Sequence, residues 1–181
     1  MLRLFFSTAE DGRSAAHALL RAVLAEEFGL ESPVFARSPG GKPCLENAPL
    51  QFSLSHSGPF ALCGVGDAPL GVDVERVRPR RPGLPRFALS DREFQWFTGR
   101  GGRWEDFYTL WTLKESFVKY TGQGLNVAPR SIAVPLLSPG ESGIFRGLWF
   151  RSYGAPGWRA ACCGQEEPQE LKRISDPFQA I

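Results

Sequence analysis

Two carboxylates lie two residues apart in the segment GVDVE, residues 71–75. Side chains alternate between the two faces of a strand, so Asp73 and Glu75 must share one face while Val72 and Val74 occupy the other. Two like charges held side by side favour a cation, and carboxylate oxygens with water suit Mg²⁺ bound to a substrate phosphate. An acidic pair on the solvated face of an edge strand is the alternative that this segment alone leaves open.

A second set of reactive groups lies in the segment 105–120, which has the strongest helical period in the chain. Trp111, Glu115 and Lys119 are spaced four residues apart and share one helix face. The apolar face is a different one and carries Phe107, Leu110, Leu113 and Phe117. If the first face packs toward the acidic strand, Glu115 supplies a third carboxylate and Lys119 a mobile cation, the groups needed to bind a metal and a diphosphate. A surface ion pair between Glu115 and Lys119 is the alternative.

Two further positions suit anion binding. Lys42 follows two glycines and precedes Pro43, so it lies on a rigid turn that can direct its ammonium at a phosphate; an ordinary solvated lysine is the alternative. His56 lies between Ser55 and Ser57 at the end of an expected strand. Neighbours on an extended chain point apart, so Ser55 and His56 cannot form a nucleophile–base pair. Their joint use would be hydrogen bonding to an anion, and a structural histidine is the alternative.

The elements that must position these groups are short and separated by turns. The pattern predicts helices over residues 14–28, ended by Gly29, over 90–97, opened by a Ser-x-x-Glu capping box, and over 105–120, ended by Gly122 and Gly124. It predicts strands over 2–6, 50–54, 60–65, 70–77, 131–137, 144–150 and 158–163, with a hairpin joining 60–65 to 70–77. Segment 37–42 is expected to be a turn, and 76–86, rich in arginine and proline, an irregular crossover between halves. Without strict βαβ alternation, these elements indicate an α+β fold.

Composition narrows the class of protein. The chain has 181 residues, 43% hydrophobic and 22% charged, enough for one core or for two small halves that share an interface. A formal charge of +2 argues against general nucleic-acid or membrane binding, and no apolar run reaches the length of a membrane span or signal-peptide core. The four cysteines lack CxxC spacing, which indicates no zinc site and a reducing compartment. We expect a cytoplasmic monomer.

Four segments follow one another along the chain: GGKP at 40–43, FSLSHSG at 52–58, GVDVE at 71–75 and LWTLKESFVKYTGQGL at 110–125. Together they resemble the 4′-phosphopantetheinyl transferases of the surfactin-synthetase-activating type, in which one chain holds two similar halves. The resemblance implies two α/β halves related by a pseudo-two-fold axis. We expect the halves at 1–70 and 71–181, with the active site at their interface.

The resemblance also implies a reaction: transfer of the 4′-phosphopantetheine arm of coenzyme A to a serine of an apo acyl or peptidyl carrier protein, releasing adenosine 3′,5′-bisphosphate. Asp73, Glu75 and Glu115 match the family's magnesium ligands. Lys119 matches the lysine that contacts the phosphates, and Glu115 is the expected base for the carrier serine. The residues expected to hold coenzyme A are Lys42, Pro43, Ser55, His56, Asp73 and Lys119.

The chain departs from the family at its N-terminus, because larger members carry a longer basic region that grips the 3′-phosphate. We expect Arg13, Arg21 or Arg37 to take its place, or else a weaker affinity for coenzyme A. The arginines at 76–86 or in GRGGR at 99–103 are expected to meet an acidic carrier protein. Two other functions stay open at this point: a non-catalytic module that binds coenzyme A or a carrier protein, and a magnesium-dependent phosphohydrolase.

Overall fold

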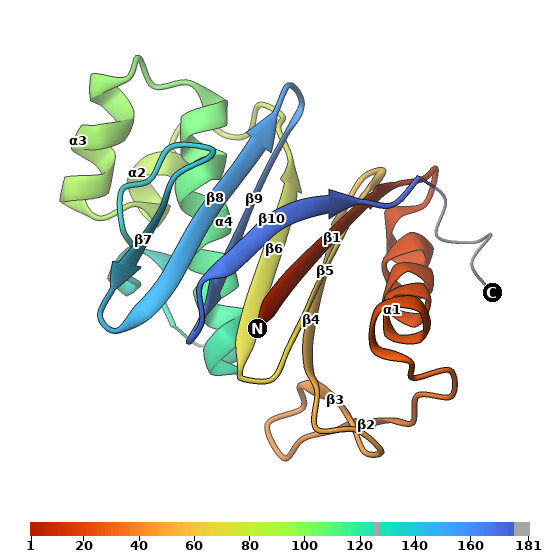
Figure 1. Ribbon diagram of the computed structural model, residues 1–181. Coiled ribbons are helices and arrows are strands. Elements are labelled where there is room, and N and C mark those ends of the chain that lie inside the picture. The colour runs from red at the N-terminus through yellow and green to blue at the C-terminus, as the bar shows by residue number, and fades with distance from the viewer. Residues whose placement is uncertain (125–126, 176–181) are drawn as a thin grey trace.

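Two four-stranded sheets form the centre of the molecule (Figure 1), which we describe from a computed structural model covering residues 1–124 and 127–175. The first sheet has the order β10-β1-β5-β4. Its strands are β1 (Leu2–Thr8), β4 (Gln51–Ser57), β5 (Phe60–Gly66) and β10 (Pro168–Arg173). The second sheet has the order β6-β9-β8-β7. Its strands are β6 (Leu70–Arg76), β7 (Ser142–Phe145), β8 (Leu148–Ala155) and β9 (Trp158–Gly164).

Helices cover the outer faces of both sheets (Figure 1). Helix α1 (Gly12–Phe28) lies on the first sheet and α4 (Trp104–Thr121) on the second. The short helices α2 (Leu84–Ala88) and α3 (Asp91–Gly99) lie next to α4, the 3₁₀ turn η2 (Pro129–Ser131) follows it, and β2 (Phe35–Arg37) with β3 (Pro43–Leu45) forms a small separate hairpin. The four cysteine thiols are free.

Three layers of the hydrophobic core pack against the two sheets, and a fourth cluster packs α2 and α3 against α4. One layer fills the space between the sheets, where Leu4 and Leu62 of the first meet Val72 and Val74 of the second. A second layer joins α1 to the outer face of the first sheet. The third joins Leu113 and other residues of α4 to β8 and β9. Each sheet is therefore buried on both faces, and the two sheets hold each other in place through apolar contact.

The three predicted helices are confirmed. Helix α1 begins after Asp11, whose carboxylate accepts hydrogen bonds from the first turn, and ends at Gly29 in a left-handed conformation. Helix α3 begins with the expected capping box of Ser90 and Glu93. Helix α4 ends at Gly122, also left-handed. Glycine suits such an end because it has no Cβ to clash. Leu125, the last residue of the fourth motif, lies outside the described residues.

The predicted hairpin of 60–65 with 70–77 is wrong. Strand β5 pairs with β1 and β4, whereas β6 pairs with β9 in the other sheet. The segment 67–69 therefore carries the chain from one sheet to the other, a role that we had predicted for 76–86. Gly and Pro mark a change of direction in both cases, but they do not determine which strands pair. The hairpin of the first sheet joins β4 to β5 instead.

Three other local predictions need correction. The strand predicted over 131–137 does not form: Ser131 ends the 3₁₀ turn η2, residues 132–137 are not in a strand, and Pro135 cannot donate a hydrogen bond to a sheet. Segment 144–150 is interrupted at Arg146 and Gly147, both with positive φ, which turn β7 into β8. The arginine-rich segment 76–86 is irregular at first, but its end enters helix α2.

The α+β class is confirmed. The pseudo-two-fold relation and the division at residue 70 remain predictions, although β6 does begin at Leu70. Strand β10, which we did not predict, returns from the C-terminal part and pairs in parallel with β1 (Figure 1). Within the described part of the chain, none of the helices combines the length and the apolar character needed to cross a membrane.

Candidate active site

Gly71 allows helix α4 to lie directly on strand β6. A Cβ atom at this position would be 2.0 Å from the carbonyl oxygen of Ser116 and 2.4 Å from the backbone nitrogen of Tyr120. Only glycine permits so close an approach of the two backbones. Gly71 shares its strand face with Asp73, so the helix is brought onto the acidic face of β6.

The reactive face of α4 packs toward the acidic strand at Asp73, an arrangement that the sequence left open beside a surface ion pair. The Lys119 ammonium lies 2.8 Å from Asp73 Oδ1 and 3.4 Å from the carbonyl oxygen of Leu54. Asp73 is 4% exposed, whereas the Lys119 side chain keeps 31% exposure. Val72 and Val74 point the other way, into the core between the sheets. The buried carboxylate is thus neutralised by a lysine that still reaches solvent, and the solvated edge-strand alternative is wrong.

Two more carboxylates share this electrostatic environment. Burial raises the pKa of Glu75, and the charge of Asp73 raises it further, while a hydrogen bond from Ser57 opposes the shift. Burial also raises the pKa of Glu115, with Asp73 the next contribution and Lys119 acting against it. Three carboxylates that repel one another inside a protein are stabilised by a cation.

The donor atoms of these residues fit Mg²⁺. Asp73 Oδ2 is buried and has no hydrogen-bond partner within the described ranges, so it is available to a cation. No preassembled group of three acidic, histidine or cysteine side chains that could hold a metal is found in the described part of the chain. Mg²⁺ does not require one, because it commonly takes one or two carboxylates together with water and substrate phosphates.

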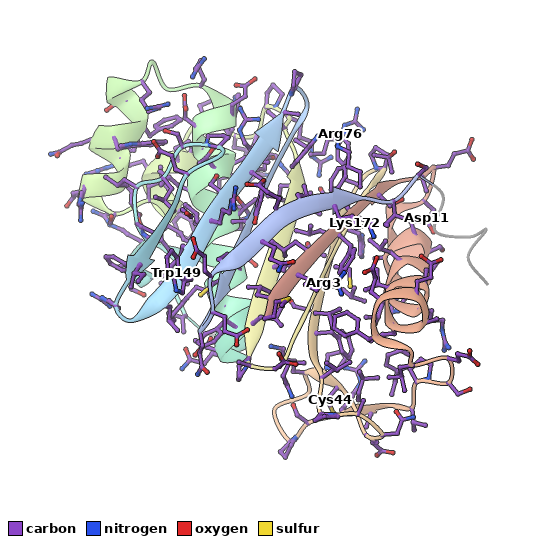
Figure 2. The ribbon with its side chains drawn as sticks, viewed as in Figure 1. Arg3, Asp11, Cys44, Arg76, Trp149 and Lys172 are labelled. Carbon is purple, nitrogen blue, oxygen red and sulfur yellow. The ribbon has the colours of Figure 1, made fainter. Side chains whose placement is uncertain are left out.

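A cavity of about 790 Å³ opens beside Lys119, within the range of ligand-binding pockets. Among its lining residues are Lys42, Pro43 and two of the three arginines expected near a phosphate, Arg21 and Arg37. Lys42 donates a hydrogen bond to the carbonyl oxygen of Leu70, 2.8 Å away, and burial lowers its pKa. The hairpin β2–β3, where Figure 2 labels Cys44, forms part of the cavity wall.

The guanidinium of Arg21 lies over the ring of Phe35, 5.2 Å from its centroid, and Phe35 also lines the cavity. The pocket therefore combines several cationic groups with an aromatic face, which suits a nucleotide bearing several phosphates. The third expected arginine, Arg13, is exposed and close enough to His56 to influence its charge.

The structure separates Ser55 from His56. Ser55 is buried and its hydroxyl donates to Asp73 Oδ1 over 2.8 Å. His56 is exposed at the opposite face of β4, where burial, followed by Arg13 and Lys119, lowers its pKa. In this structure the Ser55 hydroxyl is bonded to a carboxylate, and the joint use of the two side chains on one anion stays a prediction. Their roles toward coenzyme A remain predictions.

A second cavity, of about 480 Å³, lies on the Glu75 side of the acidic cluster. Trp111, the first residue of the predicted helix face, lines it together with Glu75, Arg80 and Phe87. Phe87 is 70% exposed. The acidic cluster therefore has one cavity on the Lys119 side and another on the Glu75 side.

Several residues of this region escaped the sequence analysis. Gly71 and Ser57 are part of recognised motifs, but their contacts depend on the packing of separate elements. Lys114 is fully buried, 2.7 Å from Glu93 Oε2 and hydrogen-bonded to the carbonyl oxygen of Ile132. It ties α4 to α3 and to the chain that follows. The sequence indicated only that Lys114 follows Leu113 of the apolar face and lies outside the reactive face of the helix.

Comparisons with known proteins identify the family of this chain. A family model described as the 4′-phosphopantetheinyl transferase superfamily matches residues 69–163, a range that holds all three carboxylates and Lys119. The chain is 28% identical over 170 residues to 4′-phosphopantetheinyl transferase Sfp of Bacillus subtilis (strain 168), covering 87% of this chain and 76% of that protein.

Two more relatives are phosphopantetheinyl transferases by name. The chain is 31% identical over 129 residues to 4′-phosphopantetheinyl transferase psf-1 of Bacillus pumilus, covering 68% of this chain and 55% of that protein. It is 30% identical over 141 residues to the mouse (Mus musculus) L-aminoadipate-semialdehyde dehydrogenase-phosphopantetheinyl transferase, covering 66% and 46%. The resemblance that the four motifs indicated is confirmed: the chain belongs to the 4′-phosphopantetheinyl transferase superfamily.

Proposed function

We propose that this protein transfers the 4′-phosphopantetheine arm of coenzyme A to a serine of an apo acyl or peptidyl carrier protein. The observation that carries the proposal is the cluster of Asp73, Glu75, Glu115 and Lys119 beside a cavity with several cationic side chains. In the reaction, the serine oxygen bonds to the phosphorus that bears pantetheine. The phosphoanhydride bond breaks, adenosine 3′,5′-bisphosphate leaves with the bond electrons, and the serine proton passes to a base.

Each residue of the cluster has a proposed role. Asp73, Glu75 and Glu115 would hold Mg²⁺, which when bound offsets negative charge on the pyrophosphate. Lys119 stabilises charge on the leaving phosphate, because its ammonium lies at the border between Asp73 and the cavity. Glu115 takes the serine proton, directly or through a water.

Coenzyme A is proposed to occupy the larger cavity. Lys42 and Pro43 line it and contact the nucleotide portion. Arg21 and Arg37 are proposed to contact the phosphates of coenzyme A, since both line the cavity, whereas Arg13 is exposed beside His56. Ser55 acts on coenzyme A through Asp73, to which it is hydrogen-bonded.

The carrier protein is proposed to approach from the side of the smaller cavity. Arg80 lines this cavity together with Glu75, so the arginine-rich segment 76–86 adjoins the acidic cluster. The arginines of 99–103 are less suitable, because Arg100 and Arg103 both pair with Asp106, at 3.2 and 3.0 Å. Paired arginines offer less charge to an acidic partner. The cytoplasmic location and the monomeric state remain predictions.

The test is the intact mass of several apo carrier proteins after incubation with this protein, coenzyme A and Mg²⁺. We expect a gain of one phosphopantetheine group that disappears with a chelator and with a carrier whose acceptor serine is alanine. Cleavage of coenzyme A without any carrier would instead indicate the phosphohydrolase. Binding without turnover on every carrier would indicate the non-catalytic module.

A further inference from the structure

Three serines alternate along β4, and each makes a hydrogen bond to β6, a strand of the other sheet. Ser53 Oγ accepts from the backbone nitrogen of Val72 at 3.1 Å. Ser55 Oγ donates to Asp73 Oδ1 at 2.8 Å, and Ser57 Oγ donates to Glu75 Oε2 at 2.7 Å. The two strands are edges of different sheets, so side-chain hydroxyls connect them where no backbone ladder does. We call this row of serines the β4 serine row.

The spacing of the β4 serine row matches that of the two carboxylates. Ser55 and Ser57 are two residues apart, as are Asp73 and Glu75, so each carboxylate meets its own hydroxyl. A hydrogen bond to a charged group is stronger than one between neutral groups. It holds one oxygen of the carboxylate in place.

The backbone that carries Ser57 is held on two sides. The carbonyl oxygen of Gly58 accepts a hydrogen bond from the backbone nitrogen of Gly12, at the start of α1, over 3.2 Å. Arg76, labelled in Figure 2 at the end of β6, packs against Gly58: a Cβ there would lie 3.1 Å from Arg76 Cδ. The Ser57 hydroxyl therefore projects from a constrained turn. Because the hydroxyl cannot move far, its hydrogen bond holds the Glu75 carboxylate in one position.

We propose that Ser57 is a positioning residue that orients the Glu75 carboxylate for Mg²⁺. The inference rests on the proposed function, and it adds a residue that acts through another, without itself touching the substrate. Glu75 is repelled by Asp73 two residues away, so without Ser57 its side chain would turn away from the cluster. Ser55 meets Asp73 in the same way, but Lys119 also holds that carboxylate. Ser57 is therefore the more discriminating position to test.

The experiment measures Mn²⁺ as a probe of the magnesium site. Free Mn²⁺ is counted by electron paramagnetic resonance with the whole protein and saturating coenzyme A, against coenzyme A alone. Ser57→Ala is expected to weaken Mn²⁺ binding about 10–100-fold, the usual effect of removing a partner of a metal ligand. Ser57→Thr keeps the hydroxyl and should restore most of the affinity. The matched control is Ser152→Ala, a buried serine whose hydroxyl has no partner in the described ranges, and it should bind Mn²⁺ as wild type does.

A structural role alone predicts a different pattern. If Ser57 only stabilised the fold, Ser57→Ala would lower the melting temperature and leave the Mn²⁺ affinity of the folded protein unchanged, which would overturn the inference. Should Ser57→Ala fail to fold, Ser57→Cys replaces it, since a thiol is similar in size and a weak donor; it too should bind Mn²⁺ more weakly. Wild-type protein that binds no Mn²⁺ and transfers nothing contradicts the proposed function as well. Wild type that does both, beside an unaffected Ser57→Ala, contradicts this inference alone.

Discussion

Replacing Gly71 by alanine would drive a methyl group into helix α4. The added carbon would lie 2.0 Å from the carbonyl oxygen of Ser116, whereas ordinary van der Waals contact begins at 3.4 Å, a shortfall of about 1.4 Å. The clash is with backbone atoms, so no side chain can rotate to relieve it. Strand and helix must therefore separate by about 1 Å or more.

Two effects follow from this separation. Overpacking of a core typically costs about 1–3 kcal/mol, and each kcal/mol lowers the melting temperature of a chain of this size by about 2–4 °C. Lys119, now 2.8 Å from Asp73, is carried by the helix that moves. A displacement of about 1 Å in a catalytic arrangement can reduce turnover about 100-fold. The loss of activity in Gly71→Ala should thus be far larger than its loss of folding stability alone would cause.

The assay compares thermal melting with the initial rate of carrier modification at a temperature where the variant is folded. Gly99→Ala is the control, because a Cβ at that position meets nothing within 4 Å. It should melt no lower than wild type and retain its rate. A Gly71→Ala protein that is folded and as active as wild type would refute the argument that this glycine sets the distance between α4 and β6.

Three other perturbations follow from the same contacts. Lys119→Met should lower kcat about 10²–10³-fold. Lys119→Arg should not restore kcat, because a guanidinium cannot reproduce the contact of an ammonium with Asp73. Steady-state kinetics measure kcat for both variants. Lys114→Met leaves the buried Glu93 without its ion-pair partner and should cost about 3–5 kcal/mol in urea unfolding, whereas adding Glu93→Gln should recover part of this. Because burial and Asp73 raise the pKa of Glu115 above 4.5 in metal-free protein, its contribution to stability is present below that pH and is lost as pH rises through the folded-state pKa. Mg²⁺ should therefore raise the melting temperature more at about pH 8 than at about pH 5, and an equal rise at both would count against this carboxylate as a ligand.

The parts of the site that arise from periodicity could be predicted from the sequence. Alternation in GVDVE placed Asp73 and Glu75 on one face, and the helical period placed Glu115 and Lys119 on a face distinct from the apolar one. Both predictions depend only on the geometry of one element. That the two faces meet depends on Gly71, whose importance becomes visible only when α4 is placed on β6.

The parts that depend on long-range pairing could not be predicted. In β4, alternation separates Phe52 and Leu54 from Ser53 and Ser55, a pattern typical of a strand with one wet face. The serine face is instead buried against the other sheet, where the hydroxyls satisfy charged and backbone groups. Strand β10 also carries no local sign that it pairs with β1, more than 160 residues away along the chain. Turn residues mark where strands end and do not select the partner strand.

The most direct test of the central claim, that Asp73, Glu75 and Glu115 form the magnesium site of a transferase, compares wild type with Glu115→Gln. The intact mass of an apo carrier protein is followed with coenzyme A, with Mg²⁺ or with EDTA, and coenzyme A binding is measured by calorimetry on both proteins. We predict that only wild type with Mg²⁺ adds the phosphopantetheine group, while Glu115→Gln stays folded and still binds coenzyme A. Transfer by Glu115→Gln at the wild-type rate, or by wild type in EDTA, would contradict this account.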